Sequence, residues 1–223
     1  MSEISSTGSA PNVFSLSDKI ASGKLKASLT ADDFKTSGKF TVQRLDLPEV
    51  LIIRPKSVFT DNRGSLFESY RYGDLAELAN CGLMPVQASV SHSIPYVLRG
   101  LHYQVKEPQG KFLTVTAGKI FDVAVDLRRS SKNFGKWCGI VLEARNPGSI
   151  YIPPKFAHGF LALEAGASVL YLCTTYHDSG ADRAIRWNDP AIGIQWPIGH
   201  GANLFMSTKD KHAPALSDAE TFA

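Results

Sequence analysis

The sequence predicts an all-β fold, built as an antiparallel sandwich or barrel with a few short helices. Two observations predict it. From about residue 40 onwards, short runs rich in Val, Ile, Leu and Phe recur at regular spacing, and Gly, Pro and Asn separate them. The chain also contains no Gly-x-Gly-x-x-Gly or phosphate-loop motif, which disfavours a parallel nucleotide-binding fold. We therefore expect one β domain over residues 41–223.

Residues 1–40 differ from the rest of the chain. They are rich in Ser, Ala, Thr and Lys and contain only scattered apolar residues. This composition is typical of an N-terminal extension, either a flexible tail or an arm that becomes ordered against a partner subunit. We assign no chemistry to it.

The expected strands follow in chain order. Residues 50–53 form the first clear run. Residues 111–116 lead through Ala117-Gly118 into residues 120–126, which predicts a hairpin. Further strands are expected at residues 139–143, 149–152, 160–163 and 169–172.

One helix is expected in the first half of the chain. Asp74 has the side chain of an N-cap residue, residues 75–79 are good helix formers, and Gly82 is suited to end the helix.

The composition is that of a soluble globular protein, with 43% hydrophobic and 20% charged residues. A net charge of +3 is too small to indicate a nucleic-acid surface, although it leaves cations available for a small anion. Cys81, Cys138 and Cys173 are widely spaced, so neither a disulfide framework nor a zinc site is expected. With no signal peptide and no membrane-spanning segment in the sequence, we expect a cytoplasmic protein without membrane contact.

The most informative segment for function surrounds His102. It lies in a strand-like run with Arg99, and Lys111 follows nearby. Imidazole accepts protons near neutral pH, and cations beside it are suited to hold an anionic substrate or an enolate. The segment indicates acid–base chemistry on an anionic substrate.

A metal site is the first alternative, because His158 also lies at a strand end. The pattern resembles the metal-binding barrels of the cupin superfamily, which use His-x-His and Pro-x-Gly-x-x-His motifs. Here Gln104, a poor ligand, stands two residues after His102, and Lys155 stands in place of the Gly. Too few donors remain, so an acid–base role for His102 is favoured over a metal.

Two further residues have open interpretations when taken alone. Tyr171 lies in an apolar run, and a core tyrosine is as compatible with that run as a catalytic one. Asp210 is equally compatible with a surface loop or a helix cap.

Several motifs together resemble one family. The chain resembles the dTDP-4-dehydrorhamnose 3,5-epimerases and their relatives, which act on nucleotide-linked 4-keto-6-deoxy sugars. The resemblance covers about residues 42–216, with the motifs in the same order. They are found at residues 61–68, 97–104 with 110–111, 121–128, 134–137, 156–160 and 185–190.

The resemblance implies a cupin-type jelly-roll β-sandwich, a homodimer that exchanges strands, and catalysis without a metal or other cofactor. It implies His102 as the base, with Asp210 paired to it. Tyr171 is implied as the acid on the opposite face of the sugar, and Lys111 as the cation near the keto oxygen. The implied substrate-binding residues are Arg63, Glu68, Gln87, Ser89, Arg99, His158, Asp182 and Lys209.

The implied reaction explains these residue types. A carbon beside the C4 ketone loses its proton only if the enolate is stabilised, which an ammonium group does electrostatically. The base then removes a proton from one face and the acid returns one to the other, which inverts the centre. Inversion of C3, C5 or both fits this scheme, in a pathway of the dTDP-rhamnose type.

The chain departs from the family pattern at four places. The family usually has Gln-Asp-Asn at residues 87–89, Glu at Asp182 and an aromatic residue at His177, and its loop between residues 102 and 111 is one residue longer. These changes spare the proton-transfer residues and leave open the base and the number of centres inverted.

Two other functions are weighed against the epimerase. One is a metal-dependent cupin enzyme that uses His102 and His158. The other is a non-catalytic nucleotide-sugar-binding protein, which the acid–base residues argue against, since binding alone needs none.

Overall fold

The computed structural model describes residues 34–79, 84–199 and 201–223. Within these residues the chain forms twelve strands and two short helices. The strands are β1 (Phe34–Ser37), β2 (Phe40–Arg44), β3 (Leu51–Pro55), β4 (Phe59–Asp61), β5 (Gly64–Leu66), β6 (Gln87–Ser93), β7 (Leu98–Gln104), β8 (Lys111–Asp126), β9 (Trp137–Glu143), β10 (Ser149–Ile152), β11 (Phe156–Cys173) and β12 (Asp182–Ala184). The helices are α1 (Tyr72–Ala79) and α2 (Thr208–Lys211). The predicted all-β class is confirmed.

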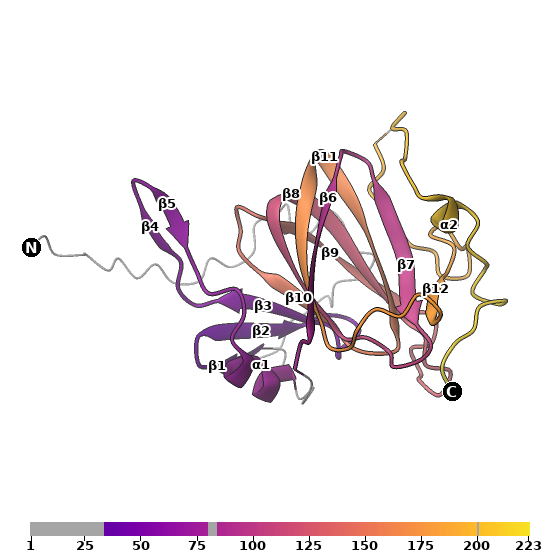
Figure 1. Cartoon of the computed structure of the whole chain (residues 1–223), viewed down its shortest axis with the longest axis horizontal. Coiled ribbons are helices and arrows are strands. Elements are labelled where there is room, and N and C mark those ends of the chain that lie inside the picture. Colours follow the sequence, from indigo (N-terminus) through magenta and orange to yellow (C-terminus); the bar gives the residue numbers. More distant parts are fainter. Residues whose placement is uncertain (1–33, 80–83, 200) are drawn as a thin grey trace, which may run out of the picture.

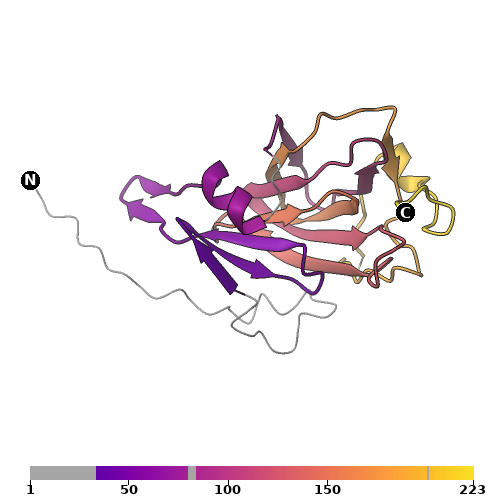
Figure 2. The ribbon, with the colours of Figure 1, turned by 90° about the horizontal axis from the view of Figure 1, so that it is seen from below.

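Two long strands connect the layers of the sandwich (Figures 1 and 2). The first part of β8 pairs with β10 and with the second part of β11, which also pairs with β6. The second part of β8 pairs with β9 and with the first part of β11, which also pairs with β7. The strands β8 and β11 therefore pass from one layer into the other.

Three apolar clusters hold the layers together. The first fills the sandwich with side chains from both layers, among them Leu113, Ile120, Phe160 and Val169. The second lies under the C-terminal segment, and the third lies where α1 covers β2 and β3. The apolar clusters therefore include side chains from both layers and from the C-terminal segment.

The predicted hairpin at residues 111–126 is wrong. These residues form the single strand β8, and both of its parts pair with β11 rather than with each other. Gly118 bends the strand with φ +71°, and a Cβ there would lie 2.0 Å from the Gly166 carbonyl oxygen. The expected strands at 160–163 and 169–172 are likewise parts of one strand, β11.

The expected helix is present, but its predicted cap is wrong. Asp74 lies inside α1, and its Oδ2 accepts a hydrogen bond from the Lys39 backbone N–H at 2.9 Å, in the turn between β1 and β2. Gly82 and Cys81 lie outside the described residues. So do the first 33 residues of the expected extension, whereas Phe34–Ser37 forms β1 and pairs with β2.

The hairpin of β4 and β5 projects from the body of the molecule (Figures 1 and 2). Two of its apolar side chains are exposed, Phe59 by 68% and Leu66 by 72%. Among the described residues, no helix combines the length and apolar character that a membrane crossing requires.

Candidate active site

His102 and Asp210 form a hydrogen-bonded pair. His102 lies on β7, and its Nε2 is 2.6 Å from Oδ1 of Asp210 on α2. Ser207 caps α2 and accepts a hydrogen bond from the Asp210 backbone N–H, which fixes the carboxylate. Asp210 is 2% exposed. Burial raises the pKa of Asp210, but hydrogen bonds and the charge of His102 outweigh burial, and the net pKa is lowered.

His158 lies directly opposite His102 on the neighbouring strand β11. Side chains of paired residues on adjacent strands share one face of the sheet, so the two imidazoles lie side by side. Nε2 of His158 is 2.8 Å from Oδ2 of Asp122, on β8. Both residues are buried, and burial raises the pKa of the Asp122 carboxyl, partly offset by His158. Asp122 was missed by the sequence reasoning, although a carboxylate within the apolar run 120–126 is a usable signal.

Tyr171 lies next to His158 on the same face. The two rings meet edge to face with centroids 6.4 Å apart. The Tyr171 hydroxyl is 3.2 Å from the hydroxyl of Ser91 on β6, a second partner that the sequence did not indicate. Burial raises the pKa of Tyr171 to about 12, so the phenol is protonated at neutral pH.

Lys111 begins β8 and pairs with Cys173 on β11. Burial lowers the pKa of Lys111, and the charges of Cys173 and Asp182 act in the opposite direction. Asp182, on β12, also forms an ion pair with Lys209 and lies 3.7 Å from Nε2 of His177. One carboxylate therefore stands among three basic side chains.

Gln87 and Ser89 lie on β6 beside Tyr171, which pairs with Ser89. The Gln87 amide donates to the Ser89 hydroxyl at 3.2 Å and accepts from the His177 backbone N–H at 2.8 Å. This amide therefore joins β6 to the loop that follows β11.

Arg99 points from β7 toward the end of β6. Its Nε donates to the Ser93 hydroxyl at 3.1 Å, and its guanidinium also bonds the His92 carbonyl. Its charge lowers the pKa of Tyr171 slightly against the larger effect of burial. Arg99 therefore lies within electrostatic reach of the Tyr171 hydroxyl.

Arg63 and Glu68 have no described contact with these groups. Arg63 is in the turn of the projecting hairpin and pairs with Asp61. Glu68 binds Lys39 at 2.9 Å. Glu68 and Lys39 also line a hollow of about 330 Å³ beside Phe59 and Leu66. The structure of one chain therefore does not bring these two predicted binding residues to the His102 region.

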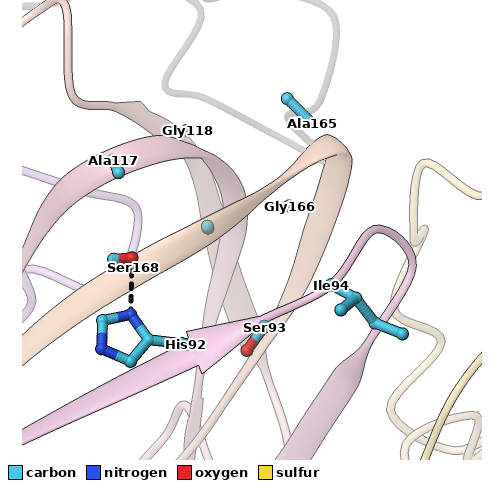
Figure 3. A pocket seen from close by; sticks show the side chains of 9 residues that line it. His92, Ser93, Ile94, Ala117, Gly118, Ala165, Gly166 and Ser168 are labelled. Atoms are coloured by element: carbon cyan, nitrogen blue, oxygen red, sulfur yellow. Dashed lines mark hydrogen bonds between the residues drawn. The ribbon is translucent and has the colours of Figure 1, made fainter.

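A second hollow, of about 290 Å³, opens where the bends of β8 and β11 meet the end of β6 (Figure 3). His92 on β6 pairs with Ser168 on β11 at the edge of this hollow, and its Nδ1 is 2.8 Å from the Ser168 hydroxyl. Its lining residues include none of the predicted site residues.

The two histidines and Gln104 are all engaged in hydrogen bonds within the protein. Each histidine has its Nε2 engaged by a carboxylate, and the Gln104 amide is bound to the backbone of Glu107, Tyr176 and Asp178. Within the described ranges, no group of three or more His, Cys, Asp or Glu side chains is placed to hold a metal ion.

Comparisons with known proteins agree on one family. The family described as dTDP-4-dehydrorhamnose 3,5-epimerase matches residues 44–218. A dTDP-4-dehydrorhamnose 3,5-epimerase from Salmonella typhimurium is 45% identical over 174 residues, which is 78% of this chain and 93% of that protein.

Solved structures show the same relation. A dTDP-6-deoxy-D-glucose-3,5-epimerase from Legionella pneumophila, in complex with dTDP-4-keto-L-rhamnose, superposes with a TM-score of 0.78 and 38% identity, covering 81% of this chain and 95% of that one. A 3'-monoepimerase from Streptomyces bikiniensis, in complex with dTDP-quinovose, has a TM-score of 0.72 and 27% identity, covering 78% and 87%. The fold is the cupin-type sandwich that the sequence motifs implied, and the chain belongs to the dTDP-4-dehydrorhamnose 3,5-epimerase family of isomerases.

Proposed function

We propose that the chain inverts C3, C5 or both in a dTDP-linked 4-keto-6-deoxyhexose, in deoxysugar biosynthesis of the dTDP-rhamnose type. The observation that carries this proposal is the pairing of His102 with the buried carboxylate of Asp210. A base that must take a carbon-bound proton needs a fixed tautomer and a counter-charge, and a buried carboxylate provides both.

The pair also selects the reacting nitrogen. Asp210 accepts the proton of Nε2, so the lone pair of Nδ1 is the base. As Nδ1 takes the proton from the carbon beside the ketone, the imidazolium that forms is stabilised by Asp210. The electron pair of the broken C–H bond moves into the enolate.

Tyr171 is proposed as the acid. Its raised pKa keeps a proton on the phenol oxygen until the enolate carbon accepts it. His102 and Tyr171 come from different strands, β7 and β11, which allows them to approach a sugar ring from opposite faces. Removal from one face and return to the other inverts the centre.

Lys111 is proposed to stabilise the enolate oxygen. An ammonium whose pKa is lowered by burial is a poorly solvated cation, and such a cation interacts strongly with a developing anion. Arg99, Lys209, Asp182, Gln87, Ser89 and His158 surround these groups and are proposed to bind the diphosphate and the sugar.

We further propose that the active protein is a homodimer. Arg63 and Glu68 lie on or beside a projecting hairpin with exposed apolar side chains, so a partner subunit is needed to bring them to a substrate. We propose residues 41–223 as the epimerase domain and residues 1–40 as an extension, whose last part, Phe34–Ser37, pairs with β2 of the domain. Because Cys138 and Cys173 are free thiols, we propose a reducing, cytoplasmic location.

The test is incubation with dTDP-4-keto-6-deoxyglucose in deuterated water, followed by proton NMR. The proposal predicts that solvent deuterium appears at C3, at C5 or at both, and that the label identifies the centre inverted. An enzyme sample that binds this substrate and leaves both positions unlabelled contradicts the proposal.

A further inference from the structure

Asp122 is a buried carboxylate with a single described partner. It lies inside the sandwich on β8 with 0% exposure, and its Oδ2 meets Nε2 of His158 at 2.8 Å. Its Oδ1 is also buried and has no hydrogen-bond partner among the described residues. Among the described residues, the only hydrogen-bond partner of this carboxylate is therefore His158.

Such a group is unfavourable for folding. A buried carboxylate with one oxygen unpaired loses its hydration without full replacement, and replacing both members of such a buried pair by apolar groups is often neutral or stabilising. The other buried carboxylates shown here are better satisfied. Asp189, for comparison, accepts the backbone N–H groups of Ala191 and Leu216 at 2.8 and 2.7 Å. Fold stability alone therefore does not explain why a carboxylate stands at position 122.

We infer that Asp122 is a positioning residue that holds His158 with its proton on Nε2, so that the Nδ1 lone pair accepts a hydrogen bond from a hydroxyl group of the hexose. This inference rests on the proposed function and adds a residue to it. The His158 ring neighbours both proposed proton-transfer residues, because His102 pairs with it on β7 and the Tyr171 ring is 6.4 Å away. A hydroxyl held there is close to both the proposed base and the proposed acid.

Asp122 is the group that fixes which ring nitrogen of His158 carries the proton. The ionisable groups that face His158 are Asp122 from β8, His102 from β7 and Tyr171 from its own strand. The His102 Nε2 is engaged by Asp210, and the Tyr171 hydroxyl by Ser91. Among the printed contacts of the described residues, only Asp122 bonds the His158 ring.

Two substitutions test the inference. Asp122→Asn removes the charge, and Asp122→Leu also removes the acceptor while keeping the branching at Cγ. In both variants we expect the KM for the dTDP-4-keto sugar to rise about tenfold or more, with a smaller change in kcat. Asp122→Asn, whose amide oxygen still faces the His158 Nε2–H, should melt close to the wild type, whereas Asp122→Leu leaves that buried N–H unpaired and should melt lower. In a His158→Gln background, adding Asp122→Asn should raise KM no further.

Asp189→Asn is the matched control, because it makes the same change at a carboxylate that holds only loop backbone. It should lower the melting temperature and leave KM unchanged. If Asp122→Asn fails to fold, or loses melting temperature and activity in parallel, Asp122 is a structural residue and the inference is wrong.

Nitrogen-15 NMR of the imidazole rings gives a readout that needs no turnover. The wild-type His158 signals, assigned by their loss in His158→Gln, should show the proton on Nε2, and Asp122→Leu should abolish that preference. A wild-type His158 protonated on Nδ1 alone overturns the inference even if the enzyme is active. Failure of the proposed function, in contrast, appears as a wild type that introduces no deuterium.

Discussion

At the scale of single residues, the site is organised around two imidazoles on adjacent strands. His102 on β7 and His158 on β11 are paired residues whose side chains lie side by side, and the Nε2 of each is hydrogen-bonded to a buried carboxylate. The two carboxylates differ in their environments. Asp210 has several hydrogen-bond donors and a lowered pKa, whereas Asp122 has one donor and a raised pKa. Similar pairs on one face can therefore serve different roles.

Asp210→Asn should reduce kcat by about 100-fold or more, because His102 loses the counter-charge for its imidazolium form. It should also remove a pH-dependent part of the stability. The folded-state pKa of Asp210 lies below its unfolded value, so the carboxylate stabilises the fold above about pH 4 and this contribution is lost as the pH falls further.

Thermal unfolding checks the stability part. The wild type should melt several degrees above Asp210→Asn at pH 7, and the difference should shrink below about pH 4. A difference that grows as the pH falls contradicts the assigned direction.

Lys111→Met should lower kcat by about 100–1000-fold, as expected for the loss of one group that stabilises an oxyanion. KM should change less, because the enolate charge exists only after proton removal. Steady-state kinetics measures both, and Lys119→Met, at an exposed lysine paired with Glu143, is the matched control. Equal loss in the two variants argues against the assignment.

The family motifs pointed to His102 and its partner Asp210, but not to the partners of His158 and Tyr171. They also pointed to Tyr171 itself, and the structure places the His102–Asp210 pair at hydrogen-bond distance. Asp122 and Ser91 were not singled out, because each becomes meaningful only through a cross-strand neighbour that pattern reasoning does not place. Local sequence indicates the chemistry of a side chain, whereas the pairing of strands that are distant in sequence determines its hydrogen-bond partner.

At the scale of elements, the strands β8 and β11 position the site. Both are bent rather than turned back, and the bends at Gly118 and Gly166 touch each other. The sequence Ala117-Gly118 between two apolar runs has the signature of a hairpin turn. The expectation failed because both runs pair with β11, a long-range partner that local turn signals do not reveal.

Gly118→Ala should be strongly destabilising. The added Cβ would lie 2.0 Å from the backbone oxygen of Gly166, and φ of +71° strains any residue with a Cβ. We expect a loss of about 2 kcal/mol or more, seen as a melting temperature lower by about 4 °C or more. Gly73→Ala is the control, because its Cβ meets nothing within 4 Å and α1 favours Ala. Equal melting temperatures for the two variants contradict the described bend.

At the scale of the whole molecule, one subunit lacks part of its proposed site. The hairpin of β4 and β5 extends from the body and exposes Phe59 and Leu66, while Arg63 and Glu68 remain beside it. Exposed apolar groups of this kind mark interaction surfaces. The proposed homodimer gives this hairpin both a partner and a function.

Leu66→Lys should weaken the dimer, because a charge then has to be buried in an apolar contact. Light scattering after gel filtration should give twice the chain mass of 24.3 kDa for the wild type and a lower mean mass for the variant at equal concentration. Tyr176→Lys, at a side chain that is 71% exposed elsewhere, should remain dimeric. A wild-type monomer with full activity contradicts the proposed assembly.

His102 is proposed to remove the proton and Tyr171 to return one from the other face of the sugar. Deuterium uptake and net inversion, followed by NMR on the same 4-keto sugar, separate these two steps. His102→Asn should abolish deuterium uptake at C3 and C5, with His92→Asn unaffected as the matched histidine control. Tyr171→Phe should retain uptake while losing most of the inverted product. Uptake at the wild-type rate in His102→Asn contradicts the proposal.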